Sequence, residues 1–82
     1  MKLYPNPASD QAIISYKLSE RSHVKIRLLD ARGMLLKSIW EGEVGAGEHE
    51  LKVNTKDLAQ GLYFYQLQSQ ENVLNRTMII RH

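Results

Sequence analysis

Apolar and polar residues alternate along most of this chain with a period of two, which is typical of half-buried β-strands. The pattern is cleanest over residues 23–28, where the odd positions are basic and the even positions are aliphatic. The even positions of residues 12–18 are likewise apolar or aromatic. We predict a core built from the inward positions of such strands: Ile14, Tyr16, Val24, Ile26, Leu28, Leu51, Val53 and Leu67.

The alternation predicts six strands, over residues 12–18, 23–28, 34–40, 48–53, 62–68 and 73–80. The third is less regular, because Leu36 and Ile39 fall out of phase and suggest a bulge or bend if both are buried. Residues 2–4 are a candidate seventh strand, which Pro5 and Pro7 would confine to an edge.

Turn signals separate these segments. Asp30 to Gly33 predicts a hairpin turn in which the carboxylate accepts a backbone N–H and the glycine takes a left-handed conformation. Residues 42–47 contain three glycines and are interpreted as a flexible connection. In residues 54–61 we expect Leu58 to pack inward, Asp57 to close a local turn and Gly61 to adopt a positive φ, and residues 70–72 predict a short turn.

No helical periodicity persists for ten residues, so the pattern predicts an all-β fold. Short antiparallel strands at this spacing favour a two-sheet β-sandwich of six to seven strands. A small barrel is the alternative, because periodicity does not show whether the sheets close. A length of 82 residues predicts a single domain.

Composition narrows the function classes. Eleven basic and nine acidic side chains give a net charge of +2, which argues against a nucleic-acid partner. No apolar run is long enough for a membrane-spanning helix, and there are no cysteines for disulfides or thiolate metal sites. The N-terminus has no signal peptide pattern, so if the mature protein is exported, its export signal is expected in a longer precursor.

Motifs for catalysis are missing from the sequence. His23, His49 and His82 lie on separate segments without zinc-ligand spacing, and no serine lies in a Gly-x-Ser-x-Gly elbow. Pairs of nearby glutamates are interpreted as solvated charges. We therefore expect no enzyme activity, no metal and no cofactor. The aromatic residues are expected mainly in the core, although an exposed pair could stack on sugar rings.

Four spaced motifs add a specific resemblance. They are Leu3-Tyr4-Pro5-Asn6-Pro7, Asp30-Ala31-Arg32-Gly33, Leu58-Ala59-Gln60-Gly61-Leu62-Tyr63-Phe64-Tyr65 and Arg76-Thr77-Met78-Ile79-Ile80-Arg81. In this order, over residues 3–81, the chain resembles the type A C-terminal sorting domain on cargo of the Bacteroidetes type IX (Por) secretion system. The resemblance implies an immunoglobulin-like sandwich and the following recognition or family-motif positions: Tyr4, Pro5, Asn6, Pro7, Gly33, Gly47, Leu58, Gly61, Tyr63, Arg76, Ile79, Ile80 and Arg81. Arg76 and Arg81 stand where lysine is frequent in the family, which keeps the charge.

The resemblance also implies a function. Residues 1–82 would be a C-terminal secretion signal that directs a cargo protein across the outer membrane, with residues 1–10 as a candidate junction to an upstream cargo domain. Its partners would be the type IX machinery and a sortase-like protease, and its location the periplasm in transit, then the cell surface or medium. Two alternatives stay open, a carbohydrate-binding module and a passive spacer appended to a secreted enzyme. Exposure of Trp40 together with Tyr16 or Tyr65 would favour the first.

Overall fold

The computed structural model describes residues 1–70 and 72–82, and its regular elements are all β-strands. The strands are β1 (Lys2–Tyr4), β2 (Gln11–Leu18), β3 (Ser22–Leu29), β4 (Leu35–Val44), β5 (Gly47–Asn54), β6 (Gly61–Gln68) and β7 (Val73–Ile80). All six predicted strands are present, and so is the short seventh at the N-terminus. The all-β prediction is therefore confirmed.

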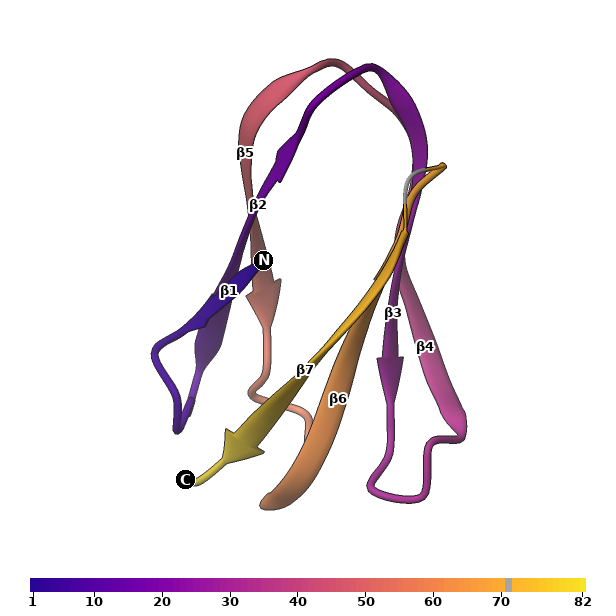
Figure 1. The fold of residues 1–82 in the computed structure, drawn as a ribbon. Helices are drawn as coiled ribbons and strands as arrows, with labels where there is room; N and C mark the ends of the chain where they lie inside the picture. Colours follow the sequence, from indigo (N-terminus) through magenta and orange to yellow (C-terminus); the bar gives the residue numbers. More distant parts are fainter. Residues whose placement is uncertain (71) are drawn as a thin grey trace.

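The strands form two sheets that face each other as a sandwich (Figure 1). One sheet has the order β1-β2-β5 and the other β4-β3-β6-β7, and neighbouring strands in both are antiparallel. The chain crosses between sheets after β2, after β4 and after β5, which gives the strand arrangement of an immunoglobulin-like sandwich. The first strand is an edge strand, as Pro5 and Pro7 predict.

The core lies between the sheets and follows the predicted alternation. Its members are Ala8, Ala12, Ile14, Tyr16, Leu18, Val24, Ile26, Leu28, Val44, Val53, Tyr65, Leu67, Met78 and Ile80. One predicted core residue is placed differently, because Leu51 is only partly buried and packs against the margin of this cluster. Leu51 lies on β5, an edge strand of its sheet, where fewer neighbours are available to cover it.

The observed β4 is longer than the predicted strand, and it has the predicted irregularity. Residues 42–44 were expected in a flexible connection, but β4 runs on to Val44, which pairs with Ser22. A Cβ atom at Gly42 would lie 2.9 Å from the Trp40 ring, so glycine here makes room for the indole. The predicted irregularity is present, because the β3–β4 register shifts at Leu36 and at Ile39. These shifts do not require both side chains to be buried, since Leu36 is half exposed.

The turns are closed by short-range hydrogen bonds. The Asp30 carboxylate accepts the backbone N–H groups of Arg32 and Met34, each at 2.9 Å, and Gly33 has a φ of 86°, as predicted. Before β6 the turn uses Asn54 instead of Asp57: the Asn54 Oδ1 accepts the Lys56 N–H at 2.9 Å. Asn54 is the last residue of β5. An asparagine side chain can accept the backbone N–H of the residue two positions later, which here is Lys56. The predicted turn at residues 70–72 includes residue 71, which lies outside the described residues.

Candidate functional site

The N-terminal Pro5-Asn6-Pro7 segment lies along the outer edge of β7, the last strand. The Asn6 side chain makes two hydrogen bonds there: its Nδ2 donates to the Thr77 carbonyl at 3.3 Å, and its Oδ1 accepts the Ile79 N–H at 3.0 Å. Because an amide carries one donor and one acceptor group side by side, it pairs with β7 as a strand backbone would. Prolines on both sides cannot donate a backbone N–H, which leaves this pairing to the asparagine.

Ala8 extends the same contact with its backbone. Its N–H donates to the Ile79 carbonyl and its carbonyl accepts the Arg81 N–H, both at 2.8 Å, forming a parallel bridge to Ile80. The buried Thr55 then fixes the next residue to the other sheet, since its hydroxyl donates to the Ser9 carbonyl at 2.7 Å. We call residues 5–9 the N-terminal strap, because they connect the edge of β7 to the end of β5.

The central motif forms a tyrosine corner at the start of β6. The Tyr63 hydroxyl donates to the Ala59 carbonyl at 2.6 Å, four residues upstream, as in other immunoglobulin-like sandwiches. Leu58 packs against the core, and Gly61 has a φ of 155°, as both were predicted to do. The last residue covers this corner, because the His82 ring N–H donates to the Leu58 carbonyl at 2.7 Å.

The two motif arginines of the terminal strand have different environments. Arg76 pairs with the inward-facing Tyr65, and its Nε donates to the Met1 carbonyl at 3.1 Å, so it links β7 to the start of the chain. Arg81 is exposed, and within the described residues its guanidinium has no hydrogen bond or ion pair. Arg76 therefore has a structural contact that Arg81 does not.

The structure brings together most of the predicted motif residues at one end of the sandwich, near the C-terminus in Figure 1. Ile80 is buried in the core there, whereas Ile79 is 40% exposed. Tyr4 lies apart, on the outer face of the β1-β2-β5 sheet, where its hydroxyl donates to Glu50 and this contact raises the pKa of the phenol. Gly47 is remote as well, because it begins β5 at the opposite end, with a φ of 115°.

Sequence reasoning missed a charged cluster across β3 and β4. The His23 Nε2 lies 2.9 Å from Glu41 and its Nδ1 lies 3.3 Å from Glu43, which also contacts Arg21 at 3.7 Å. The hydrogen bond to Glu41 is the main cause that raises the pKa of His23, and the same bond lowers the pKa of Glu41. The alternation places these residues on one face, but finding the pairs needs the strand register.

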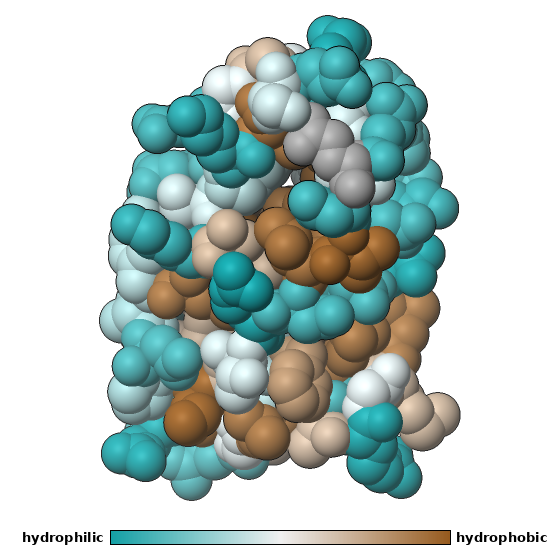
Figure 2. Space-filling model, in the orientation of Figure 1, coloured by the Kyte–Doolittle hydropathy of each residue, from teal (hydrophilic) through white to brown (hydrophobic). Residues whose placement is uncertain are grey.

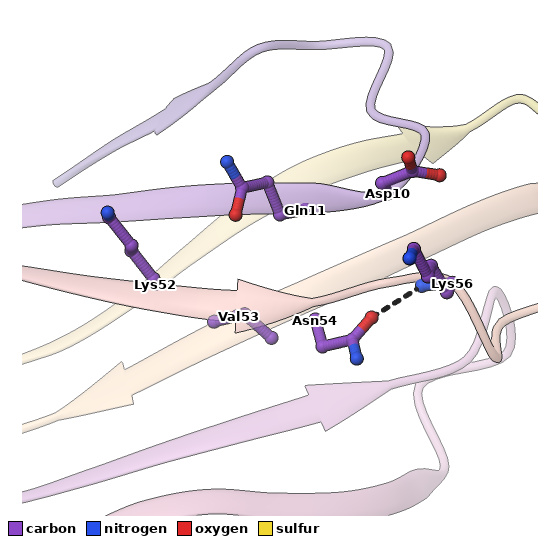
Figure 3. Close-up of a pocket in the computed structure, with 6 residues that line it drawn as sticks. All are labelled: Asp10, Gln11, Lys52, Val53, Asn54 and Lys56. Atoms are coloured by element: carbon purple, nitrogen blue, oxygen red, sulfur yellow. Dashed lines mark hydrogen bonds between the residues drawn. The ribbon is translucent and has the colours of Figure 1, made fainter.

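The polar residues around one surface hollow come from two neighbouring strands and the segments beside them. Figure 3 shows one hollow beside β2 and β5, where Asp10, Gln11, Lys52 and Asn54 extend in different directions and do not converge on one point. Asn54 is already engaged there by the Lys56 N–H. Within residues 1–70 and 72–82, no group of three or more His, Asp or Glu side chains has an arrangement that could hold a metal ion.

The aromatic residues do not form the exposed pair expected of a sugar platform. Trp40 is 36% exposed, but Tyr16 is only 8% exposed and Tyr65 is fully buried. Tyr16 instead packs on the His49 ring, with centroids 5.5 Å apart. The carbohydrate-binding alternative is therefore not favoured.

Comparison with known proteins agrees with the motif geometry. The model of the secretion system C-terminal sorting domain family matches residues 2–81, nearly the whole chain. Comparison with curated proteins and with solved structures gave no match. In the described part of the chain, no helix is long and apolar enough to cross a membrane. The chain thus belongs to the secretion system C-terminal sorting domain family, and it is a signal for export across the outer membrane by the type IX secretion machinery, to the cell surface or medium.

Proposed function

We propose that residues 1–82 act as one folded sorting domain without catalytic activity. The domain passes through the periplasm and is recognised there by the type IX machinery. The observation that supports this most is the N-terminal strap, in which Asn6 and Ala8 hold the edge of β7. The two ends of the domain are thereby fixed to each other. A folded domain of this kind offers the same terminal surface whatever cargo precedes it.

The junction with the cargo is proposed to lie on the N-terminal side of β1. Residues 2–4 are paired with β2, and residues 5–9 hold β7, so a cut after residue 4 would remove part of the fold. We infer that a sortase-like protease would cut on the N-terminal side of Met1, because the Met1 carbonyl accepts the Arg76 Nε–H and Lys2 already pairs with β2. Such a cut would release the cargo and leave the sorting domain intact.

The motif positions divide into two roles under this proposal. Asn6, Leu58, Gly61, Tyr63 and Ile80 have contacts or conformations that hold the sandwich together. Ile79 and Arg81 instead place exposed side chains at the end of β7. The second group is the part that we expect the machinery to contact.

A reporter fusion tests this division. The domain is fused to the C-terminus of a periplasm-directed reporter in a bacterium with a type IX machine, and reporter at the surface and in the medium is measured. We expect Arg81→Glu to reduce delivery while the purified domain keeps its melting temperature. Lys56→Glu, an exposed charge reversal in the β5–β6 connection, is the matched control and should be delivered normally.

Arg76→Glu is expected to act differently, because it also breaks the contact to the Met1 carbonyl. It should lower the melting temperature as well as delivery. Normal delivery of a folded Arg81→Glu fusion would reject the role of this charge. Retention of the unmodified fusion in the periplasm would reject the assignment of residues 1–82 as a sufficient signal.

A further inference from the structure

The outer face of the β4-β3-β6-β7 sheet carries an apolar strip at the end nearest the C-terminus. The register places Leu35 beside Leu29, Leu29 beside Phe64, and Leu62 beside Ile79. These side chains alternate with Leu28, Tyr65 and Ile80, which point into the core. We call Leu29, Leu35, Leu62, Phe64 and Ile79 the outer strip.

The outer strip is more exposed than apolar residues of a packed sheet normally are. Leu35 is 57% exposed, Leu62 42% and Ile79 40%, and the three come from three different strands. Figure 2 shows hydrophobic residues in several patches on the face where β7 lies, with hydrophilic residues between and around them. Contiguous exposed apolar residues bordered by polar ones are typical of surfaces that bind another protein.

Arginines border the outer strip. Arg27 projects from β3 on the same outer face, two residues before Leu29, while Arg32 lies in the β3–β4 turn and Arg81 follows β7. The Asp30 carboxylate accepts the Arg32 and Met34 N–H groups and also pairs with the Arg32 guanidinium at 3.3 Å, which leaves Arg27 and Arg81 as the other cations of the border. The border is therefore basic, although the whole chain has a net charge of only +2.

We propose that the outer strip is the surface by which this domain docks on a protein of the export machinery, and that the partner presents an apolar groove bordered by carboxylates. This inference rests on the proposed function of the chain as a folded sorting domain. Burial of the leucines and of Ile79 would supply the affinity, and pairing of the arginines with carboxylates would set the orientation.

The charges argue against a second copy of this chain as the occupant. A twofold contact through the outer strip would bring the basic border of one copy against that of the other. Like charges facing each other across an interface disfavour the contact. A partner with acidic residues around its groove removes this repulsion.

The test uses the reporter fusion with paired substitutions of exposed residues. Leu62→Thr with Ile79→Thr changes a direct cross-strand pair of the outer strip, and threonine keeps the preference for a strand. Val73→Thr is the matched control, because Val73 is 50% exposed and shares an outward register with Ile79 on β7 but lies at its far end. Melting temperatures of the purified domains establish that each variant folds.

We expect the Leu62→Thr/Ile79→Thr fusion to be delivered at least about fivefold less than the unmodified one, because truncating central contacts weakens an interface strongly. Val73→Thr should be delivered normally. Should the double variant fail to fold, Leu35→Thr on β4 applies the same test, and its normal delivery would overturn the proposal.

Three other results would also overturn it. One is normal delivery of the folded double variant, which would leave the sorting function intact and exclude the strip. Another is an equal loss from Val73→Thr, which would mean that the effect is not specific to the strip. The third is a dimer of the purified domain, in sedimentation, that the double variant dissociates, because the strip would then be a self-interface. Failure of the unmodified fusion would instead reject the proposed function itself.

Discussion

The Asn6 side chain stands beside Ile79 in the place of a neighbouring strand. Its Oδ1 accepts the Ile79 N–H at 3.0 Å, although the two residues are 73 positions apart. An edge strand with unpaired backbone groups is open to pairing with other chains. The Asn6 side chain and the Ala8 backbone pair with this part of the edge. The contact joins the N-terminal segment of the domain to its last strand.

Asn6→Ala is therefore expected to lower the free energy of unfolding by about 1 kcal/mol, because two hydrogen bonds to β7 are lost and Asn6 is exposed to competing water. Asn75→Ala is the control, since the Asn75 side chain makes a single exposed hydrogen bond, with Gln66, and its backbone carbonyl is kept in the variant. It should change stability by less than about 0.5 kcal/mol. Urea unfolding measures both, and equal losses would show that the strap is not held by Asn6.

Much of the fold follows from local pattern, because side chains on a strand alternate between two faces whatever the partner strand is. That is why the inward positions of β2, β3 and β6 were predictable, and why Leu36 and Ile39 marked the register shifts of β4. The extent of β4 was not predictable. From the sequence alone, Gly42 indicates a flexible segment. Its close packing against Trp40 depends on the orientation of the indole ring, which the sequence does not reveal.

The candidate site was predictable as a set of motif positions but not as a geometry. Tyr63 and Ala59 are four residues apart, so their corner is a local feature. The pairing of Asn6 with Ile79 and of Arg76 with Met1 joins opposite ends of the chain, which periodicity cannot reveal. Arg76 differs from Arg81 in such a long-range contact, because the Arg76 side chain donates to Met1 while the Arg81 guanidinium has no partner among the described residues.

Gly45, between β4 and β5, and Gly47, the first residue of β5, should respond differently to alanine. Gly47 has a φ of 115°, a conformation that residues with a Cβ rarely adopt, while Gly45 has an ordinary φ. Neither Cβ would meet another atom within 4 Å, so packing does not distinguish the two positions. We expect Gly47→Ala to cost roughly 1–2 kcal/mol through backbone strain.

Gly45→Ala should be neutral or slightly stabilising, because alanine restricts the unfolded chain and fits the native backbone. Thermal and urea unfolding of the two variants provide the comparison. Similar stabilities would mean that the start of β5 relaxes to a backbone that any residue can adopt.

Removing a hydroxyl should have opposite effects at two tyrosines of β6. Tyr63→Phe loses the bond to the Ala59 carbonyl and should cost about 1 kcal/mol. Tyr65 is fully buried, and its hydroxyl has no hydrogen-bond partner within the described residues. Tyr65→Phe should therefore be neutral or stabilising, since it removes a polar group that burial leaves unpaired.

Tyr65→Phe should also change how the stability of the domain depends on pH in the alkaline range. Burial raises the pKa of Tyr65 from its ordinary value of 10 to about 12. The unfolded chain then loses its phenol proton first, so the stability of the unmodified protein falls as the pH rises from about 10 towards 12. The variant should lose less stability over this range in urea titrations followed by fluorescence. A larger loss in the variant would contradict the burial of this hydroxyl.

The charged cluster on β3 and β4 predicts a stability that depends on pH. The bond to Glu41 raises the pKa of His23 above its ordinary value of 6.5, so the folded state holds this proton more tightly than the unfolded state. The contribution is fully present below about pH 6.5 and is lost as the pH rises through the folded-state pKa. Glu41 has the opposite dependence: its pKa is lowered, so its contribution is lost at acid pH, as the pH falls through its folded-state value.

His23→Gln should therefore lower the melting temperature at about pH 6 and have a smaller effect at about pH 9, where the imidazole is neutral in both states. Because the pair is exposed to solvent, high salt should reduce the difference at the lower pH. Titration of the His23 ring by NMR provides the direct measurement, and Glu41→Gln should move its midpoint downward. Glu48→Gln, on the other sheet, is the control and should leave the midpoint unchanged. A His23 midpoint at or below 6.5 in the unmodified protein would contradict the pairing, since the contacts with Glu41 and Glu43 favour the charged ring.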